Sequence, residues 1–481
     1  MPQWIVVSIE KATPIFMLLV VVGVVLWRMP KVDIGHSAAF KQRRFGNWFP
    51  LGLMYAFLYF GRYNINEATT ALGKLVDNAA FGTIFAVGAW SYGLSFLVNG
   101  PLTDKLGGRF TILLATMGSA GANIALGVLA WAVVDGGFAP PGGLVLWMSV
   151  LYGINMYFQS FGAVSIVKIN AAWFHVRERG VQGGVFGILI SLGIYFGYDW
   201  SAAIVKAAPT SPWFAFFVPA AVLLVICVVG FFTVRDSPNE AGFKDFDVGD
   251  ASSNDAVDAK APSAADVFLK MLRNPVIVTI VAIEFCTGFL RNGVMSWYPK
   301  FAKATGLIDA ADAPATIGGF VSANWGMLLC VFGIVGGMFA GIISDKVFQS
   351  RRGPVATVLY AGITLGAVAM FFCLELPWVG IILVFMALNY VGVHGMLSGT
   401  ASADFGGRKN TGVAVGVIDG FVYLGTGLQS LIVGMVLPTG DAAKVAANWI
   451  YWPIAMIPVA LIGLALCLRV WNARAQPAAA H

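Results

Sequence analysis

The chain has 481 residues, of which 58% are hydrophobic and only 11% are charged, and its mean hydropathy is +0.79. Soluble globular proteins carry about a quarter charged residues, so this composition excludes a single water-soluble core and predicts a protein that folds in lipid. The formal net charge of +6 does not indicate a nucleic-acid-binding protein, because the basic residues are dispersed over short loops.

The five cysteines lie in apolar runs and form no Cys-x-x-Cys pair. Neither a disulfide framework nor a zinc site is therefore predicted. No Walker sequence and no nucleophile–base constellation is present, so the sequence favours neither an ATP-driven pump nor an enzyme. We expect the protein to work without a metal or another cofactor.

Apolar segments recur along the chain at the length that crosses a bilayer as a helix, which is about 20 residues. Thirteen such spans are predicted, at residues 12–28, 48–71, 81–101, 110–134, 143–168, 181–204, 213–234, 275–303, 316–342, 354–373, 378–400, 411–436 and 448–469. The sequence thus predicts an all-α membrane protein.

The first of these spans could be the core of a signal peptide. Glu10 and Lys11 give no clean positive region before it, however, and no Ala-x-Ala cleavage site follows it, so we expect a retained helix. The polar segment after it is rich in basic residues, namely Arg28, Lys31, Lys41, Arg43 and Arg44. Because cytoplasmic loops carry an excess of Lys and Arg, this segment is predicted to be cytoplasmic. Alternation from there puts most basic residues on the same side, with the N-terminus outside and the C-terminus inside the inner (plasma) membrane.

The stretch from Arg235 to Lys270 has little apolar content and predicts a flexible cytoplasmic linker. Apart from the extra first span, six predicted spans precede it and six follow, which suggests two repeated halves. The predicted parts are an extra transmembrane helix with a basic cytoplasmic linker (1–47), an N-terminal six-helix bundle (48–234), a cytoplasmic linker (235–274), a C-terminal six-helix bundle (275–469) and a cytoplasmic tail (470–481).

Two equivalent turns, one in each half, carry similar charged sequences. The turn at 100–109 reads Gly-Pro-Leu-Thr-Asp-Lys-Leu-Gly-Gly-Arg, and the turn at 341–346 reads Gly-Ile-Ile-Ser-Asp-Lys. Each resembles the loop signature of the major facilitator superfamily. An Asp and basic residues at a helix end can bind neighbouring helix termini and hold one conformer, although ordinary charge in a cytoplasmic loop is an alternative. The candidate latch residues are Asp104, Lys105, Arg109, Asp345, Lys346 and Arg352.

A narrower resemblance covers nearly the whole 6+6 core and leaves out the extra helix. Five stretches carry it, at residues 60–64, 173–180, 290–299, 344–348 and 423–425. In these stretches the chain resembles the organophosphate:phosphate antiporters, the group of glycerol-3-phosphate and hexose-6-phosphate carriers. This resemblance implies the major facilitator fold, and it implies that Arg62 and Arg291 bind the substrate phosphate.

Arg62 and Arg291 also stand out from the residues alone, because each lies well inside the first core span of its half. A charged side chain at a helix centre in lipid costs at least about 2.5–3.5 kcal/mol, so such residues usually face a cavity or a partner. The planar guanidinium fork suits phosphate oxygens and stays charged at any working pH. The alternative is that each Arg only pairs with a buried acid, for instance Glu67 or Glu284. Tyr63, next to Arg62, is a further candidate for substrate contact.

The chain departs from the family pattern at three positions. The resemblance aligns Phe96 and Ile190 with a Lys and a His that are familiar there, and Tyr63 with a Lys. The predicted site therefore has fewer cations than the family pattern, which favours a less charged or bulkier anion over glycerol-3-phosphate itself.

Four ionisable residues in apolar surroundings are candidates for proton coupling, namely Glu67, Glu284, His394 and Asp419. The alternative is structural: a satisfied acid in each case, and a helix-packing residue in the case of His394. Glu284 and Arg291 share a helix face but stand about 10 Å apart along the axis, so direct pairing within that helix is not expected.

The sequence therefore predicts a secondary transporter that exchanges a phosphorylated small organic anion for inorganic phosphate by alternating access. A proton-coupled organic anion symporter is the first alternative. A non-transporting sensor of a phosphorylated sugar is the second, because the resembled family contains a hexose-phosphate sensor. The expected partners are the anionic substrate, inorganic phosphate and the lipid bilayer, without nucleic acid, and the protein is expected to be a monomer.

Overall fold

The computed structural model describes residues 35–175, 178–248, 273–306, 316–349, 351–397 and 411–472, together with the single positions 20, 23, 269 and 271. At 179–184, 345 and 411–415 it describes the backbone only. The predicted first span at 12–28 falls almost wholly outside these residues, as does most of the predicted linker.

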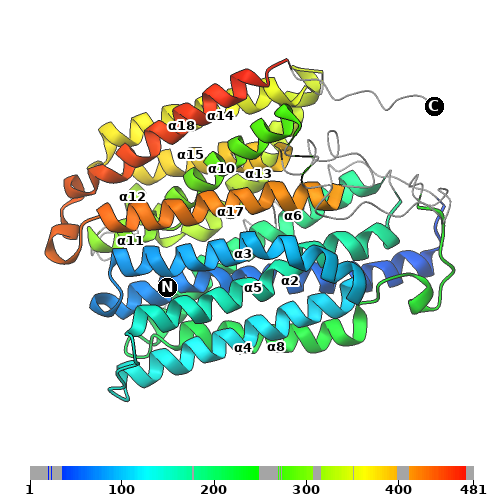
Figure 1. Ribbon diagram of the computed structural model, residues 1–481, viewed down its shortest axis with the longest axis horizontal. Coiled ribbons are helices and arrows are strands. Elements are labelled where there is room, and N and C mark those ends of the chain that lie inside the picture. Colours follow the sequence, from blue (N-terminus) through cyan, green and yellow to red (C-terminus); the bar gives the residue numbers. More distant parts are fainter. Residues whose placement is uncertain are drawn as a thin grey trace, which may run out of the picture.

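Every regular element in the described part of the chain is a helix, so the predicted all-α class is confirmed. The first half contains α2 (Ala38–Leu72), α3 (Asn78–Leu106), α4 (Gly108–Val134), α5 (Leu144–Trp173), α6 (Arg179–Tyr195), α7 (Ser201–Ala207) and α8 (Phe214–Thr233). The second half contains α10 (Pro275–Met295), α11 (Trp297–Ala304), α12 (Ile317–Ala323), α13 (Trp325–Lys346), α14 (Arg352–Cys373), α15 (Val379–His394), α17 (Thr411–Val436) and α18 (Tyr451–Arg469). The long helices run along the long axis of the molecule in Figure 1.

The predicted core spans coincide with these helices, with interruptions that the hydropathy pattern did not reveal. The span predicted at 275–303 breaks at Ser296, the span at 316–342 breaks at Asn324, and the span at 181–204 contains a π-helical turn at Phe196–Trp200. Eleven helices of the described chain are long and apolar enough to cross a membrane. α2 has 35 residues but is not among these eleven, and polar side chains occupy both its first and its last turns. The count of thirteen spans therefore stays a prediction.

Local sequence explains where several helices begin. Asp77 precedes α3 and its carboxylate accepts a hydrogen bond from the backbone N–H of Ala80 at 2.8 Å. Asn274 precedes α10 and accepts from the N–H of Val276 at 2.9 Å, with Pro275 at the first helical position. Side chains of this kind accept hydrogen bonds from the free N–H groups of a first turn. Proline, which lacks a backbone N–H, is favourable at the first helical position because an N–H there would have no partner within the helix.

Glycines let α17 pack backbone to backbone against α10. A Cβ atom on Gly288 would lie 1.9 Å from the carbonyl oxygen of Val422, and one on Gly425 would lie 2.0 Å from that of Phe285. Neither position can accept a larger side chain without separating the helices. This close approach places Tyr423 of α17 beside the face of α10 that carries Arg291.

The two halves meet along two helix pairs. In Figure 1, α17 of the second half lies beside α3 of the first half. The second pair is α6 with α13, where an apolar cluster includes Ile188, Tyr195, Met327 and Cys330. Each half thus contributes helices to one central interface, as expected for two bundles around a shared site.

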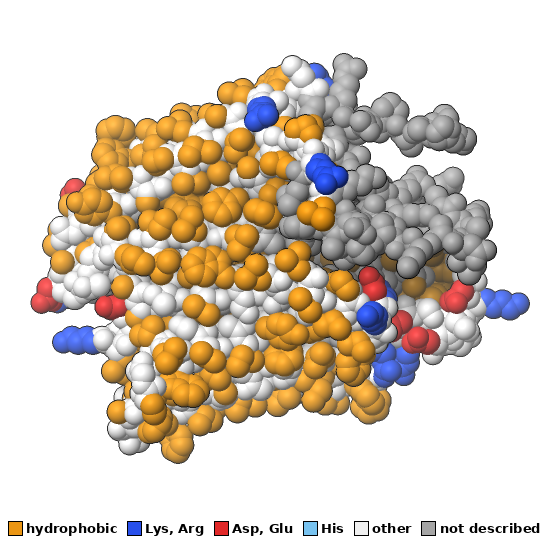
Figure 2. All heavy atoms as spheres, viewed as in Figure 1, with side chains coloured by type: hydrophobic (Ala, Val, Ile, Leu, Met, Phe, Trp, Pro, Cys, Tyr) orange, Lys and Arg blue, Asp and Glu red, His pale blue; other side chains and the backbone are white. Residues whose placement is uncertain are grey.

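The outer surface along the helices is apolar, which agrees with a membrane protein. Figure 2 shows hydrophobic side chains over the length of the helices on this face, with Lys, Arg, Asp and Glu toward the two ends. Large apolar side chains are strongly exposed, for example Phe372 at 76% and Val225 at 66%. A soluble monomer rarely exposes a continuous apolar surface of this extent, whereas lipid covers it without cost.

The first part of the predicted flexible linker is packed on the first half. Asn47 of α2 exchanges two hydrogen bonds with the backbone of Arg235, at 2.7 and 3.2 Å. The rings of Phe243 and Phe246 contact Phe40 edge-on at 5.7 and 5.5 Å. The prediction of a flexible linker is therefore wrong for residues 235–246, because two phenylalanines in a polar stretch anchor it to α2.

Candidate functional site

Arg62 lies on α2 in the centre of the molecule and is fully buried. Its Nε donates a hydrogen bond to Oε1 of Gln159 at 2.8 Å, and its Nη1 donates to the hydroxyl of Tyr423 at 2.5 Å. Its Nη2 has no hydrogen-bond partner among the described residues. A buried charged donor without an acceptor is costly, so this side of the fork is available to a ligand oxygen.

Aromatic rings, rather than an acid, surround the Arg62 guanidinium. The rings of Tyr59 and Tyr92 each lie 4.4 Å from its central carbon, and that of Tyr423 lies 5.7 Å away. The negative faces of aromatic rings attract a cation and make its burial less costly. No Asp or Glu forms an ion pair with Arg62 or Arg291 within the described residues, which leaves the structural alternative without its proposed acids.

Amide side chains from two other helices hold α2 at the level of Arg62. The carbonyl oxygen of Gly61 accepts hydrogen bonds from Nδ2 of Asn123 at 3.0 Å and from Nδ2 of Asn155 at 2.8 Å. The hydroxyl of Tyr152 donates to the carbonyl oxygen of Arg62 at 3.1 Å. These bonds fix the backbone that carries the arginine, and the hydropathy pattern gave no sign of them.

Arg291 lies on α10 and is partly exposed. Its guanidinium carbon lies 5.7 Å from the ring of Tyr423, and it makes no hydrogen bond to any described residue. Tyr423 therefore contacts both arginines, one through its hydroxyl and one through its ring. The sequence predicted the two arginines as a pair, and it offered no reason to place Tyr423 between them, since Arg62 and Tyr423 are 361 residues apart.

Tyr63 forms part of an aromatic wall beside the arginines. It is 5% exposed, its ring stacks on Tyr198 at 5.4 Å, and it tilts against Tyr59 at 5.8 Å. Of the other two apolar departures from the family pattern, Phe96 is buried and Ile190 is partly buried. Phe96 is 7% exposed and meets Tyr92 edge-on at 4.9 Å, and Ile190 packs on the apolar core of the first half.

Three of the four candidate proton-coupling residues gather in the second half. Glu284 is fully buried, and its Oε2 lies 3.0 Å from Nδ1 of His394 on α15. Asp419 on α17 interacts electrostatically with His394. Glu67 does not join this group. It interacts instead with Lys300 on α11, whose buried Nζ also donates to the hydroxyls of residues 69 and 70.

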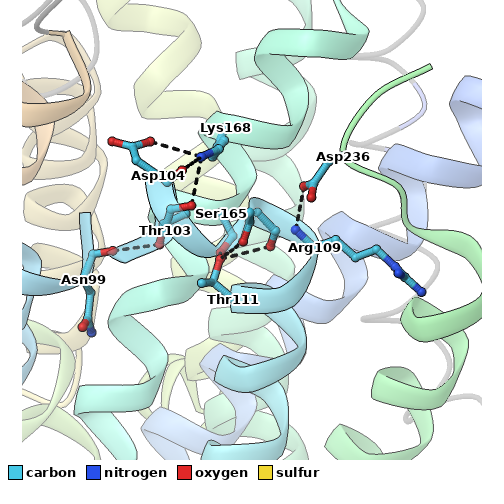
Figure 3. A network of polar contacts seen from close by, with 10 residues as sticks. Asn99, Thr103, Asp104, Arg109, Thr111, Ser165, Lys168 and Asp236 are labelled. Carbon is cyan, nitrogen blue, oxygen red and sulfur yellow. Dashed lines mark hydrogen bonds and ion pairs between the residues drawn. The ribbon is translucent and has the colours of Figure 1, made fainter. Parts of the chain in front are cut away.

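The candidate latch of the first half joins α3, α4, α5 and the linker (Figure 3). Nζ of Lys168 binds the carbonyl oxygens of Thr103 and Asp104 at 2.9 and 2.8 Å and the Asp104 carboxylate at 3.4 Å. The backbone N–H of Arg109 donates to Oδ1 of Asp236 at 2.7 Å, so an acid from the linker caps α4. Burial raises the pKa of Asp236, and the hydrogen bond from Arg109 opposes that rise.

The remaining latch candidates differ in their contacts. The Arg109 guanidinium donates to the carbonyl oxygen of Phe231 at the end of α8, at 2.8 Å, whereas Lys105 is exposed. In the second half, Arg352 donates to the hydroxyl of Ser344 at 3.0 Å, and Lys346 is exposed. The side chain of Asp345 lies outside the described part of the chain. Among described residues, no cluster of three or more His, Cys, Asp and Glu side chains could hold a metal ion.

The sequence matches the Major Facilitator Superfamily over residues 51–430, which is most of the chain. The chain belongs to the Major Facilitator Superfamily. Solved structures agree on the fold: an inward-facing bacterial homolog of the human lysosomal transporter Spinster superposes with a TM-score of 0.69 at 14% identity, covering 92% of this chain and 100% of that chain. A D-xylose-proton symporter superposes with a TM-score of 0.60 at 16% identity, covering 86% and 96%.

Curated relatives match nearly end to end. The glycerol-3-phosphate transporter of Bacillus subtilis (strain 168) is 24% identical over 92% of this chain and 95% of its own length. The "Probable hexose phosphate transport protein" of Chlamydia pneumoniae is 25% identical over 90% and 92%. The membrane sensor protein UhpC of Salmonella typhimurium (strain LT2) is 25% identical over 88% and 90%. The predicted superfamily, the resemblance to organophosphate:phosphate antiporters, the membrane location and the non-enzymatic class are confirmed.

Proposed function

We propose that this protein is a secondary transporter that carries a small phosphorylated organic anion across the inner membrane, in exchange for inorganic phosphate. The observation that carries this proposal is the convergence of Arg62 and Arg291, one from each half, on the single side chain of Tyr423. The names of the relatives support phosphorylated compounds as the cargo class.

Charge matching supports a phosphate ester over a neutral solute. A phosphate monoester carries about −1.5 to −2 charges at neutral pH, and two guanidinium groups offset that charge without an acid to compete. Arg62 is buried, and its Nη2 has no hydrogen-bond partner in the described part of the chain, so an anion oxygen there can accept from it. An anion that binds both arginines also pulls the two halves together, which is how binding can drive alternating access.

The aromatic lining sets a limit on the cargo. Phe96 and Ile190 are packed apolar residues where the family pattern has cations. With two arginines at its centre among the described residues, the site favours an anion with one phosphate and a larger uncharged part. We therefore propose a bulkier or less charged ester than glycerol-3-phosphate.

The hydrogen bonds that join the two halves support a rocking motion about this site. Within the described residues, these hydrogen bonds lie either at the level of Arg62 or toward the end of the molecule where residues 73–77 connect α2 to α3. Asn78 donates to the carbonyl oxygen of Pro438, Lys300 donates to Thr69, and Asp199 accepts from α13. These contacts close the end predicted to be outside, and they must break when the site opens there.

The test is counterflow in proteoliposomes made from the purified chain. Vesicles loaded with inorganic phosphate are offered labelled phosphate esters of increasing size and, separately, labelled carboxylates. We expect accumulation of at least one phosphate ester that depends on internal phosphate. Accumulation of carboxylates alone, or of esters without any dependence on internal phosphate, would contradict the proposal.

A sensor is the second candidate, because a membrane sensor protein is among the relatives at 25% identity. A sensor binds the ester but does not move it. Thermal stabilisation of the purified protein by an ester that gives no counterflow would favour this second candidate.

A further inference from the structure

The second half contains a buried acid–base pair that anion binding at the two arginines does not use. Glu284 lies on α10, is fully buried, and has a single hydrogen-bond partner among the described residues, Nδ1 of His394. Its other oxygen, Oε1, has none. A buried carboxylate with one unpaired oxygen is unfavourable, so it depends strongly on the charge of its histidine partner.

We propose that Glu284 and His394 form a proton site, and that anion binding at Arg291 is coupled to the uptake of one proton at Nε2 of His394. This inference rests on the proposed function, because it names the ion that accompanies the anion. The proton comes from water and adds to the imidazole ring, which becomes an imidazolium. No covalent bond of the substrate forms or breaks.

The exposure of the two side chains indicates that the proton binds to His394 rather than to Glu284. The side chain of His394 is 28% exposed, whereas that of Glu284 is not exposed at all. With Nδ1 held by the Glu284 carboxylate, Nε2 is the ring nitrogen left to bind a proton. Glu284 then acts as the fixed counter-charge of the imidazolium, as carboxylates do beside many histidines that change charge.

The charged and titratable groups that interact with this pair, with Arg291 or with one another come from five helices. They are Cys286 and Arg291 on α10, Tyr360 on α14, Tyr390 on α15, Asp419 and Tyr423 on α17, and Cys467 on α18. Tyr360 is engaged elsewhere, since its hydroxyl donates to the carbonyl oxygen of Ile283 at 3.1 Å. Asp419 carries a negative charge and Arg291 a positive charge, and both interact electrostatically with His394, so an anion bound to Arg291 changes the charge that His394 faces.

The link to the anion follows from this arrangement. Arg291 stands two turns from Glu284 on the same helix, about 10 Å along the axis. An anion bound to Arg291 cancels the positive charge that repels a proton from His394, so the ring binds a proton more readily. Coupling of two binding events is reciprocal, so a protonated His394 must also strengthen anion binding.

Glu67 is a poor site for the same role. It interacts electrostatically with Lys300 and Lys303 at the predicted outer end of α2 and α11. The structure thus separates two candidates that the sequence could not rank.

The first experiment needs no ligand. The chain has four histidines, so the signals of ¹⁵N-labelled histidine in the purified protein can be assigned with the variant His394→Gln. We expect the His394 signal to titrate within about pH 5–8, where histidine changes charge. A His394 signal that stays constant over this range would overturn the proton site.

The second experiment measures the coupling. Calorimetric titration of the wild type with inorganic phosphate, in two buffers that differ in protonation heat, gives the protons taken up per anion. We expect fewer protons in His394→Gln and in Glu284→Gln than in the wild type, and no change in His36→Gln, a histidine that packs on Phe40 outside the spans. The proton uptake of phosphate itself is the same in every variant, so the difference belongs to the protein.

The outcomes separate the two proposals. Equal proton uptake in the wild type and His394→Gln, with phosphate bound by both, would overturn the coupling and leave the proposed function intact. Failure of the wild type to bind phosphate would count against the proposed function and against the coupling, and the histidine titration would then decide the proton site alone. If His394→Gln does not fold, Glu284→Gln carries the comparison.

Discussion

The planar fork of Arg62 does what no other cation can do at that position. One nitrogen donates to Gln159, one donates to Tyr423, and the third has no partner among the residues that the structure describes. A lysine is a point charge on a flexible stem and cannot satisfy these directions at once. Arg291 differs in being partly exposed and without a hydrogen bond to a described residue, so more of its fork is open to a ligand.

Replacement of either arginine by lysine is therefore expected to weaken phosphate binding while the protein still folds. Loss of one charge-assisted contact costs about 1.5–3 kcal/mol, or roughly ten-fold or more in affinity. The measurement is the thermal stabilisation of Arg62→Lys and Arg291→Lys by inorganic phosphate, with Arg469→Lys, an exposed position, as the control. If phosphate raises the melting temperature of both site variants as much as that of the wild type, the two-arginine model is wrong.

Tyr423→Phe tests the bridge between the arginines. The change keeps the ring and removes the hydroxyl that accepts from Nη1 of Arg62, so we expect the free energy of unfolding to fall by about 1–3 kcal/mol. A bound phosphate supplies a new acceptor, so phosphate should raise the melting temperature more in this variant than in the wild type. A smaller rise in the variant would show instead that the hydroxyl itself binds the anion.

At the scale of elements, α13 takes its cap from the other half of the protein. Asn324 precedes α13 and makes no capping hydrogen bond with its side chain. Asp199 accepts from the N–H groups of Gly326 and Met327 at 2.7 and 2.9 Å instead. A carboxylate at a helix N-terminus satisfies free donors and complements the helix dipole. The hydrogen bonds of Asp199 thus both join the two halves and cap the N-terminus of α13.

Asp199→Ala should favour opening at the predicted outer end. The two lost bonds join α13 to the first half, so spin labels placed after α7 and after α14 should show a larger population at long distance. Asp135→Asn is the matched control, because Asp135 is an exposed acid after α4 within one half. An unchanged distance distribution in Asp199→Ala would mean that this cap does not contribute to closure.

The linker offers a second test at this scale. Phe243→Ala removes part of the cluster on Phe40, so we expect a loss of roughly 1–2 kcal/mol in unfolding free energy, measured as a lower melting temperature. Removal of residues 251–260, which are polar in sequence, should leave the melting temperature nearly unchanged. The interpretation fails if the deletion lowers the melting temperature as much as the Phe243 variant does.

At the scale of the whole molecule, the two halves meet at the proposed site, and hydrogen bonds join them there and toward one end. The distribution of basic residues predicts which end faces the cytoplasm, because cytoplasmic loops carry an excess of Lys and Arg. The clustered Arg and Lys between 28 and 44 predict that their end lies inside and the N-terminus outside.

This orientation predicts that a cysteine engineered at residue 3 reacts with a membrane-impermeant thiol reagent added outside intact cells. The five native cysteines lie within the described helices, four of them buried, and give a low background. Labelling of residue 3 from the cytoplasmic side alone, in inverted vesicles, would reverse the orientation.

Some features of this protein follow from the sequence by itself. Hydropathy over a span's length depends only on neighbouring residues, so the core helices and the division into halves could be predicted. A charge inside an apolar run is equally visible along the chain, and for that reason Arg62, Arg291 and Glu284 are conspicuous in the sequence. The paired charged turns pointed to the superfamily because each is a local pattern.

The tertiary structure decided which residues meet. Tyr423 touches Arg62 across 361 positions of sequence, and His394 meets Glu284 across 110. Contacts of this kind depend on which helix faces pack together, here through the glycine contacts of α10 and α17, and no periodicity along one helix reveals them. The breaks at Ser296 and Asn324 could not be predicted for a related reason, since a short irregular turn within an apolar run leaves the hydropathy unchanged.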